Sequence, residues 1–191
     1  MSSVKSILLA GVGGQGVIRA SDIIANALMV SGYDVKKSEV HGMAQRGGCV
    51  TSHVRYGEKV YSPLSSKGDT DILLSFEKME SLRYLESLKP GAVIIVNDEE
   101  IYPPSVNLGS QDYPDHIPDT LRKYFEKVKL INGPEIAIEA GNSKTVNSIM
   151  IGALSQYVEI DVPIWEEVIR KSFPENLSGV NLKAFHLGRK A

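Results

Sequence analysis

Ile7-Leu8-Leu9-Ala10-Gly11-Val12-Gly13-Gly14-Gln15-Gly16 is the stretch of sequence that decides the fold. Its apolar run at 7–10 is short and continuous, which is typical of a strand buried on both faces. After Gly16, apolar residues recur every three or four positions up to Leu28, the spacing of an amphipathic helix. A buried strand, a glycine turn and a helix together predict the first unit of an α/β sheet.

The rest of the chain repeats this alternation. Short apolar or alternating runs predict strands at 33–35, 50–54, 60–61, 72–74, 92–96 and 128–131, with a hairpin turn at 56–59 and a chain break at Pro90-Gly91. Helical spacing predicts helices over 77–88, over 146–157, from Pro163 onward and over 181–191. Residues 98–127 hold four prolines among polar residues and predict an irregular surface excursion. We therefore expect one domain over 1–191 with a doubly wound, Rossmann-like fold, in which helices cover both faces of a mostly parallel sheet.

Composition narrows the class of protein. The 191 residues include 23 acidic and 21 basic side chains, a net charge of −2, which argues against a nucleic-acid partner. Apolar runs are much shorter than the about 20 residues that span a bilayer, and the first residues do not resemble a signal peptide. The single cysteine, Cys49, excludes an internal disulfide and a self-contained iron–sulfur cluster. We expect a cytoplasmic protein without a membrane partner.

The glycine loop is the first candidate site. The spacing of Gly11, Gly13 and Gly16 fits the dinucleotide fingerprint, in which glycines let the backbone approach a pyrophosphate at a helix N-terminus. The candidate loop residues are Gly11, Gly13, Gly14, Gln15 and Gly16. The fingerprint also needs an acidic residue about 20 positions later for the ribose, and Asp34 and Glu39 fit only loosely. Val-Ile at 17–18 replaces the Lys-Ser/Thr of a P-loop, which argues against nucleoside triphosphate hydrolysis. An anion or nucleotide, a subunit contact and a tight turn without any ligand all remain open.

A second candidate site lies in Ser38–Gly48, a predicted loop that combines His41, Gln45 and Arg46 with three glycines. Loops at the carboxyl ends of strands form the ligand crevice of a doubly wound sheet, so these side chains can lie near the glycine loop. Arg46 could bind a carboxylate or phosphate through two hydrogen bonds, and His41 could donate a hydrogen bond or relay a proton. The alternative is a simple bend with Arg46 in a surface ion pair.

Neither a metal site nor a cysteine nucleophile is predicted. Cys49 and His53 are four residues apart, which on a strand separates them by about 13 Å, beyond hydrogen-bond reach. We expect Cys49 to be a buried, unreactive thiol. The four histidines show no metal-ligand spacing.

Several motifs in order resemble one known family. They are ILLAGVGGQGV at 7–17, SEVHGMAQRGG at 38–48, YSPL at 61–64, NSIMIGAL at 147–154 and NLKAFHLG at 181–188. Together they resemble the gamma-type domain of 2-oxoacid:ferredoxin oxidoreductases, and the 38–48 stretch is most similar to the small (beta) subunit of the indolepyruvate type. The resemblance extends from residue 7 to about residue 188, and Cys49 beside the Gly47-Gly48 pair is one of its few departures.

The resemblance implies an enzyme subunit that is inactive alone. Such enzymes oxidatively decarboxylate a 2-oxoacid with thiamine diphosphate, Mg, iron–sulfur clusters and coenzyme A, and they pass electrons to ferredoxin; the indolepyruvate type converts arylpyruvates to aryl-acetyl-CoA and CO2. We expect this chain to hold none of these cofactors, because it has one cysteine and its nearest approach to a thiamine motif, Gly68-Asp69-Thr70, lacks the second glycine. A large partner subunit is then required, and His41, Gln45 and Arg46 are expected at the junction with it, with Arg46 meeting the substrate or coenzyme A.

Two other functions compete with this interpretation. A free-standing NAD(P)-dependent oxidoreductase would need a ribose acid and a catalytic Tyr-x-x-x-Lys pair, and the pair at Tyr33 and Lys37 lies in a predicted strand, where the side chains do not converge. A non-catalytic nucleotide-binding regulatory module is the second alternative. Tight nucleotide binding by the isolated chain would favour either one.

Overall fold

The computed structural model describes residues 4–41 and 48–191, without the side chain of His41. Its centre is a six-stranded sheet in the order β2-β3-β1-β4-β5-β6. The strands are β1 (Lys5–Val12), β2 (Asp34–His41), β3 (Cys49–Gly57), β4 (Thr70–Ser75), β5 (Leu88–Asn97) and β6 (Lys127–Ile131). The pairs β1–β4, β4–β5 and β5–β6 are parallel, whereas β3 runs antiparallel to both of its neighbours. The sheet is therefore mixed, with four adjacent parallel strands.

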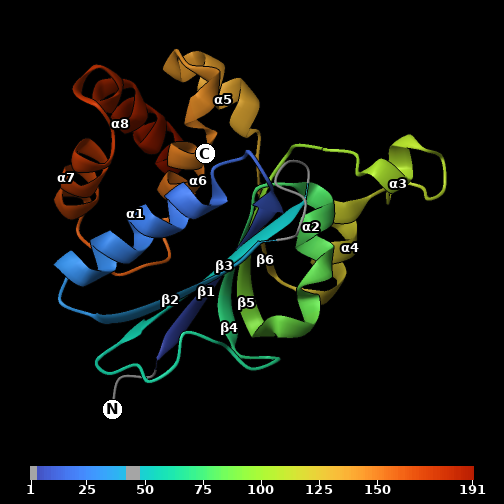
Figure 1. Cartoon of the computed structure of the whole chain (residues 1–191), viewed down its shortest axis with the longest axis horizontal. Coiled ribbons are helices and arrows are strands. Elements are labelled where there is room, and N and C mark those ends of the chain that lie inside the picture. Colours follow the sequence, from blue (N-terminus) through green and yellow to red (C-terminus); the bar gives the residue numbers. More distant parts are fainter. Residues whose placement is uncertain (1–3, 42–47) are drawn as a thin grey trace.

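Helices cover both faces of the sheet (Figure 1). The helices are α1 (Val17–Val30), α2 (Lys78–Arg83), α3 (Pro104–Asn107), α4 (Ile117–Tyr124), α5 (Gly133–Ala140), α6 (Val146–Leu154), α7 (Val162–Ser172) and α8 (Glu175–Lys190). The short helix α3 buries no residue and projects away from the sheet. Helices α1, α6, α7 and α8 bury their apolar residues against one face, and α2 and α4 against the other. This confirms the expected α/β architecture.

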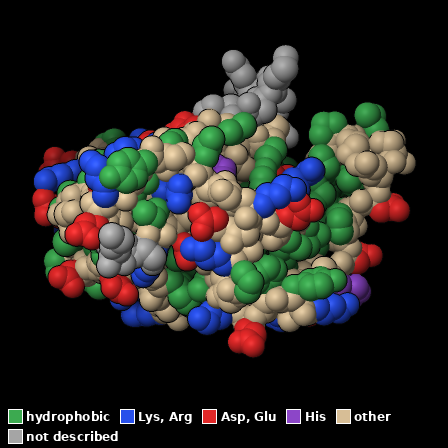
Figure 2. Space-filling model, turned by 90° about the horizontal axis from the view of Figure 1, so that it is seen from below, with side chains coloured by type: hydrophobic (Ala, Val, Ile, Leu, Met, Phe, Trp, Pro, Cys, Tyr) green, Lys and Arg blue, Asp and Glu red, His purple; other side chains and the backbone are tan. Residues whose placement is uncertain are grey.

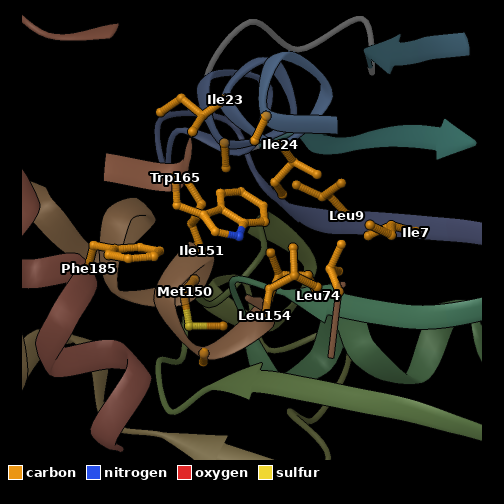
Figure 3. Packing of buried hydrophobic residues seen from close by; sticks show 14 of the residues in the cluster. Ile7, Leu9, Ile23, Ile24, Leu74, Met150, Ile151, Leu154, Trp165 and Phe185 are labelled. Carbon is orange, nitrogen blue, oxygen red and sulfur yellow. The ribbon is translucent and has the colours of Figure 1, made fainter. Parts of the chain in front are cut away.

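Side-chain alternation along β1 divides the core in two. Ile7 and Leu9 point into the larger cluster, and Leu8 and Ala10 into the smaller one; all four are fully buried. A strand that is apolar at every position is therefore required here, because both of its faces are covered. Figure 3 shows the larger cluster, in which Trp165 packs among residues from α1, α6 and α8.

Helices α6 and α8 are in backbone contact. A Cβ atom added at Gly152 would lie 2.1 Å from the carbonyl oxygen of Phe185, and one added at Gly188 would lie 2.0 Å from that of Ile149. Each glycine therefore removes a side chain where the two helices cross. The C-terminal helix is held close to α6, whose first residues face the carboxyl edge of the sheet.

Several local expectations are wrong. Residues 38–41, expected at the start of a loop, belong to β2. Residues 60–61 form no strand; Val60 is buried in a loop, and its backbone N–H donates to Oδ2 of Asp34 at 2.9 Å. The helix expected over 77–88 covers little more than α2, because a 3-10 turn follows over Leu85–Ser87 and Leu88 already begins β5. Pro90-Gly91 lies inside β5, where both residues are exposed and the register with β4 shifts.

The segment expected to be irregular, 98–127, differs from that expectation at α3 and α4. Helix α4 has a proline in its first turn and buries Ile117 and Leu121, four residues apart on one face. These two side chains complete the smaller apolar cluster. The excursion thus supplies part of the cover on this face of the sheet.

Candidate functional site

A pocket of about 540 Å³ lies at the carboxyl end of β1. Its lining comes from the glycine loop, from the segment after β5 and from the start of α6: Gly13, Gly14, Gln15, Gly16, Glu99, Ile101, Ser143, Lys144, Val146 and Asn147. A second hollow of about 320 Å³ lies on the other side of the same loop, against Val50 of β3. Both hollows lie where the order of the strands changes direction. From β1 the chain passes through α1 to β2 on one side of the sheet, and from β4 it passes through α2 to β5 on the other side. Doubly wound folds bind their ligands at such a position.

The glycines of the loop are required for different reasons. Gly14 and Gly16 adopt φ angles of 108° and 79°, a left-handed backbone that side chains disfavour. Gly11 has no such angle; a Cβ there would lie 2.8 Å from Cγ2 of Val17 and 2.9 Å from Oε1 of Gln15. Gly11 is therefore explained by internal packing, whereas Gly14 and Gly16 shape the turn into α1.

The side chain of Gln15 joins the loop to the ends of β4 and β5. Its Oε1 accepts a hydrogen bond from the backbone N–H of Val12 at 2.8 Å. Its Nε2 donates to the carbonyl oxygen of Phe76 at 2.8 Å and to Oε2 of Glu99 at 3.0 Å. The loop is thus held to the two neighbouring strand ends.

The pocket offers positive potential from the backbone at one side. Helix α1 begins after Gly16 with no side-chain cap and no acidic residue in its first turn, so the N–H groups of that turn have no side-chain acceptor among the described residues. The exposed Lys144 adds a cation to the lining, while Glu99 adds a carboxylate. This combination suits a ligand that carries both an anionic group and hydrogen-bond donors.

Both candidate regions from the sequence meet at this edge. The backbone N–H of Gly13 donates to the carbonyl oxygen of Gly48 at 2.9 Å, and Val12 pairs with Cys49 in the sheet. His41 ends β2 opposite Val50. The side chain of His41, and Gln45 and Arg46, lie outside the described residues. The structure therefore places the ends of their segment beside the glycine loop.

Of the two residues considered as ribose acids, Asp34 lies at the wrong end of its strand to serve. Asp34 begins β2, which is parallel to β1 in direction, so it lies at the opposite end of the sheet from the loop. There its carboxylate accepts from Lys36 at 2.6 Å and from Val60 N–H. Glu39 forms an ion pair with Lys37.

Glu99 is the carboxylate that lines the pocket, and sequence reasoning missed it. The available signal was an acidic run, Asp-Glu-Glu at 98–100, directly after the apolar run that forms β5. The carboxyl ends of parallel strands lie at one edge of the sheet, where ligands bind. An acidic run that directly follows a strand is therefore a candidate for the binding site.

Cys49 is not arranged as a nucleophile. Its Sγ donates to Oε2 of the buried Glu80 at 3.0 Å and lies 2.9 Å from the hydroxyl of Tyr84. Burial, reinforced by the Glu80 carboxylate, raises the pKa of the thiol to about 11, so it is protonated at neutral pH. His53 lies further along β3, and its buried Nδ1 has no hydrogen-bond partner among the described residues. The expectation of an unreactive thiol agrees with this geometry, although Cys49 is half-buried rather than buried.

The described residues do not fit the metal-bearing cofactors of the resembled family. Within 4–41 and 48–191, no group of three or more His, Cys, Asp or Glu side chains could hold a metal ion. Asp69, in the stretch nearest to a thiamine motif, is instead paired with Arg55 at 3.3 Å and with Lys89 at 3.4 Å.

Two surface properties complete the description. Acidic and basic side chains are interspersed over the face drawn in Figure 2. Among the helices in the part of the chain that the structure describes, none is long and apolar enough to cross a membrane.

Comparison with known proteins identifies the family. Residues 6–191 match the family described as pyruvate ferredoxin/flavodoxin oxidoreductase. The chain is 41% identical to the indolepyruvate oxidoreductase subunit IorB of Thermococcus kodakarensis, over 97% of this chain and 95% of that protein. It is also 41% identical to the subunit of the same name from Archaeoglobus fulgidus, over 96% of this chain and 92% of that protein.

A solved structure agrees. The 2-oxoglutarate:ferredoxin oxidoreductase of Magnetococcus marinus, with 2-oxoglutarate, coenzyme A and succinyl-CoA bound, superimposes with a TM-score of 0.76 at 26% identity. All of this chain is covered, but only 31% of that longer chain. The pattern of motifs, the fold and these similarities agree that the chain belongs to the pyruvate ferredoxin/flavodoxin oxidoreductase family.

Proposed function

We propose that the chain is the cofactor-free subunit of an indolepyruvate:ferredoxin oxidoreductase. The complex converts an arylpyruvate and coenzyme A to aryl-acetyl-CoA and CO2, and it passes two electrons to ferredoxin. The observation that carries this proposal is the 41% identity, over nearly the whole length of both chains, to subunits named for indolepyruvate. Identity to proteins named for 2-oxoglutarate is lower, at 30% for a 2-oxoglutarate synthase subunit KorC and 26% for the Magnetococcus marinus enzyme.

A larger partner subunit supplies the chemistry. Thiamine diphosphate with Mg provides the decarboxylating centre, and iron–sulfur clusters carry the electrons. We assign both to the partner, because the described residues of this chain do not fit them. One supporting observation is that this fold covers 31% of the chain of the 2-oxoglutarate enzyme, so the rest of that chain is about twice as long as this domain. A free cysteine thiol and no disulfide suit the reducing cytoplasm, where we place the complex.

The glycine loop and the 41–48 segment form the side of this subunit that faces the substrates. The start of α1 offers N–H groups that have no side-chain cap among the described residues, an arrangement that favours phosphate, and coenzyme A is the phosphate-bearing substrate of the reaction. Arg46 follows His41 by five residues and precedes Gly48, which is bonded to the loop, so we assign it the phosphate of coenzyme A or the carboxylate of the oxoacid. Gln45 and His41 complete the junction.

The first experiment tests the assembly. The tagged chain is purified without oxygen from its host and assayed for viologen reduction with indolepyruvate and coenzyme A, with 2-oxoglutarate and pyruvate as comparison substrates. We expect a brown complex with a stoichiometric large subunit and a preference for arylpyruvates. A colourless chain that purifies alone and binds NAD(H) tightly contradicts the proposal and favours a nucleotide-binding function.

The second experiment tests Arg46. In the assembled enzyme, Arg46→Ala should raise the KM for coenzyme A or for the oxoacid about tenfold, the effect of losing one charge-assisted contact. Arg170→Ala is the matched control, because Arg170 is an exposed arginine on α7 that lines neither hollow. Unchanged KM values with unchanged assembly contradict the role of Arg46.

A further inference from the structure

We infer that Gln15 is a positioning residue: its side-chain amide, oriented by Glu99, fixes the shape of the glycine loop that a substrate phosphate meets. The inference rests on the proposed function, since it concerns the substrate side of that subunit. It assigns a role to a residue whose side-chain amide is bonded to the protein at the edge of the pocket.

The amide of Gln15 has every polar atom in use. Its single acceptor oxygen takes the N–H of Val12, and its two donor hydrogens go to Phe76 O and to Glu99 Oε2. Exchanging the oxygen and nitrogen would set an oxygen against two acceptors and a nitrogen against a donor. The amide therefore has one favourable orientation, and that orientation fixes the backbone at Val12 immediately before the turn.

Glu99 is itself held in place. Its Oε2 also accepts from Nδ2 of Asn97 at 2.9 Å, and the fully buried Asn97 accepts the N–H of Gly133 at 3.1 Å. Asn97 Nδ2 donates in addition to Phe76 O at 3.0 Å. The network thus connects the ends of β1, β4 and β5 to the start of α5. These bonds fix the position of the glycine loop relative to all four elements.

The first glycine of the motif serves this arrangement. A Cβ at position 11 would lie 2.9 Å from Oε1 of Gln15, inside the space that the amide occupies. Gly11 and Gln15 are therefore a matched pair: the glycine leaves room for the side chain that folds back over it. The backbone N–H groups at the start of α1 then remain available to a ligand among the described residues.

A positioning role makes a specific kinetic prediction. Decarboxylation and electron transfer occur on cofactors held elsewhere, so a distorted loop weakens the binding of coenzyme A without slowing the saturated enzyme. A purely structural role would instead lower thermal stability or assembly and leave the KM unchanged.

The test uses the assembled complex. Gln15→Glu keeps the size of the side chain but sets an oxygen against the carbonyl of Phe76 and the carboxylate of Glu99. We expect the KM for coenzyme A to rise about tenfold, with kcat changed less than about twofold, as for a half-buried donor removed from its acceptors. Adding Glu99→Gln restores a donor opposite the new carboxylate and should recover part of the loss. Gln111→Glu, at an exposed position in the 98–127 segment, is the matched control.

The outcomes separate the inference from the proposed function. An active wild-type complex in which Gln15→Glu leaves the KM for coenzyme A unchanged overturns the inference alone, and so does a raised KM that Glu99→Gln does not improve. If Gln15→Glu prevents assembly, Gln15→Asn replaces it, because a neutral amide one methylene shorter cannot span Val12 and Glu99; the same KM change is expected. A wild-type complex without activity toward arylpyruvates overturns the proposed function instead.

Discussion

Replacing Gly152 with alanine should destabilise the protein, because the backbones of α6 and α8 meet at this residue. The new Cβ would lie 2.1 Å from the carbonyl oxygen of Phe185, whereas real Cβ contacts essentially never fall under 3.0 Å, so the helices must separate by at least 0.9 Å. Overpacking a core by one methyl group costs about 1–3 kcal/mol, and a rigid backbone obstacle favours the upper end. Alanine recovers about 1 kcal/mol of helix propensity. The net loss is about 2 kcal/mol, or about 4–8 °C in Tm for a chain of this length.

Guanidinium unfolding followed by the fluorescence of Trp165 measures this loss, since that residue is the only tryptophan and is fully buried. Gly179→Ala is the matched control on α8: a Cβ there meets nothing within 4 Å, so it should stabilise the protein by about 0.4–1 kcal/mol. The two substitutions are thus predicted to change the free energy of unfolding in opposite directions. A Gly152→Ala protein that unfolds at or above the wild-type denaturant concentration refutes the close contact of α6 and α8.

Two further predictions concern titration. Alkylation of Cys49 should accelerate with an apparent pKa near 11, and Glu80→Gln should lower that value, because it removes an anion from the thiol; a wild-type thiol that titrates near its usual value contradicts the contact. Burial lowers the pKa of His53, so the unfolded chain binds a proton that the folded chain does not. The free energy of unfolding should therefore fall as the pH drops below about 6.5, and His53→Asn should flatten this dependence in denaturant titrations from about pH 8 to pH 5. If the free energy of unfolding changes with pH equally in the wild type and in His53→Asn, then His53 does not contribute to the pH dependence.

The first β–α unit could be predicted well because its signals are local. The run Ile7–Ala10, the glycines and the apolar spacing through Leu28 all indicate a strand, a turn and a helix. The observed β1 and α1 begin and end within two residues of the limits that these signals set. The place of β3 could not be predicted in this way. Its insertion between β1 and β2 depends on pairings between distant segments, which no periodicity within Cys49–Gly57 encodes.

The site was predicted in part. The glycine spacing located the loop, and the sheet topology brought Gly13 beside Gly48 as expected for two loops at one edge. The contact between Gln15 and Glu99 joins residues 84 positions apart, so only a folded chain reveals it. The fingerprint also misassigns Gly11, whose absent side chain makes room for an amide rather than for a phosphate.

The direction of β1 determines where a tag can be attached without covering the glycine loop. Lys5 and Val12 are the two ends of this strand, so the beginning of the strand lies about 25 Å from the glycine loop at a rise of about 3.3 Å per residue. An affinity tag or surface anchor attached ahead of Lys5 therefore leaves the substrate-facing edge unobstructed. A fluorophore at Lys144, which lines the pocket, would by contrast report on its occupancy. Immobilising the protein by its amino-terminal end presents the opposite edge of the sheet, with both hollows, to the solution.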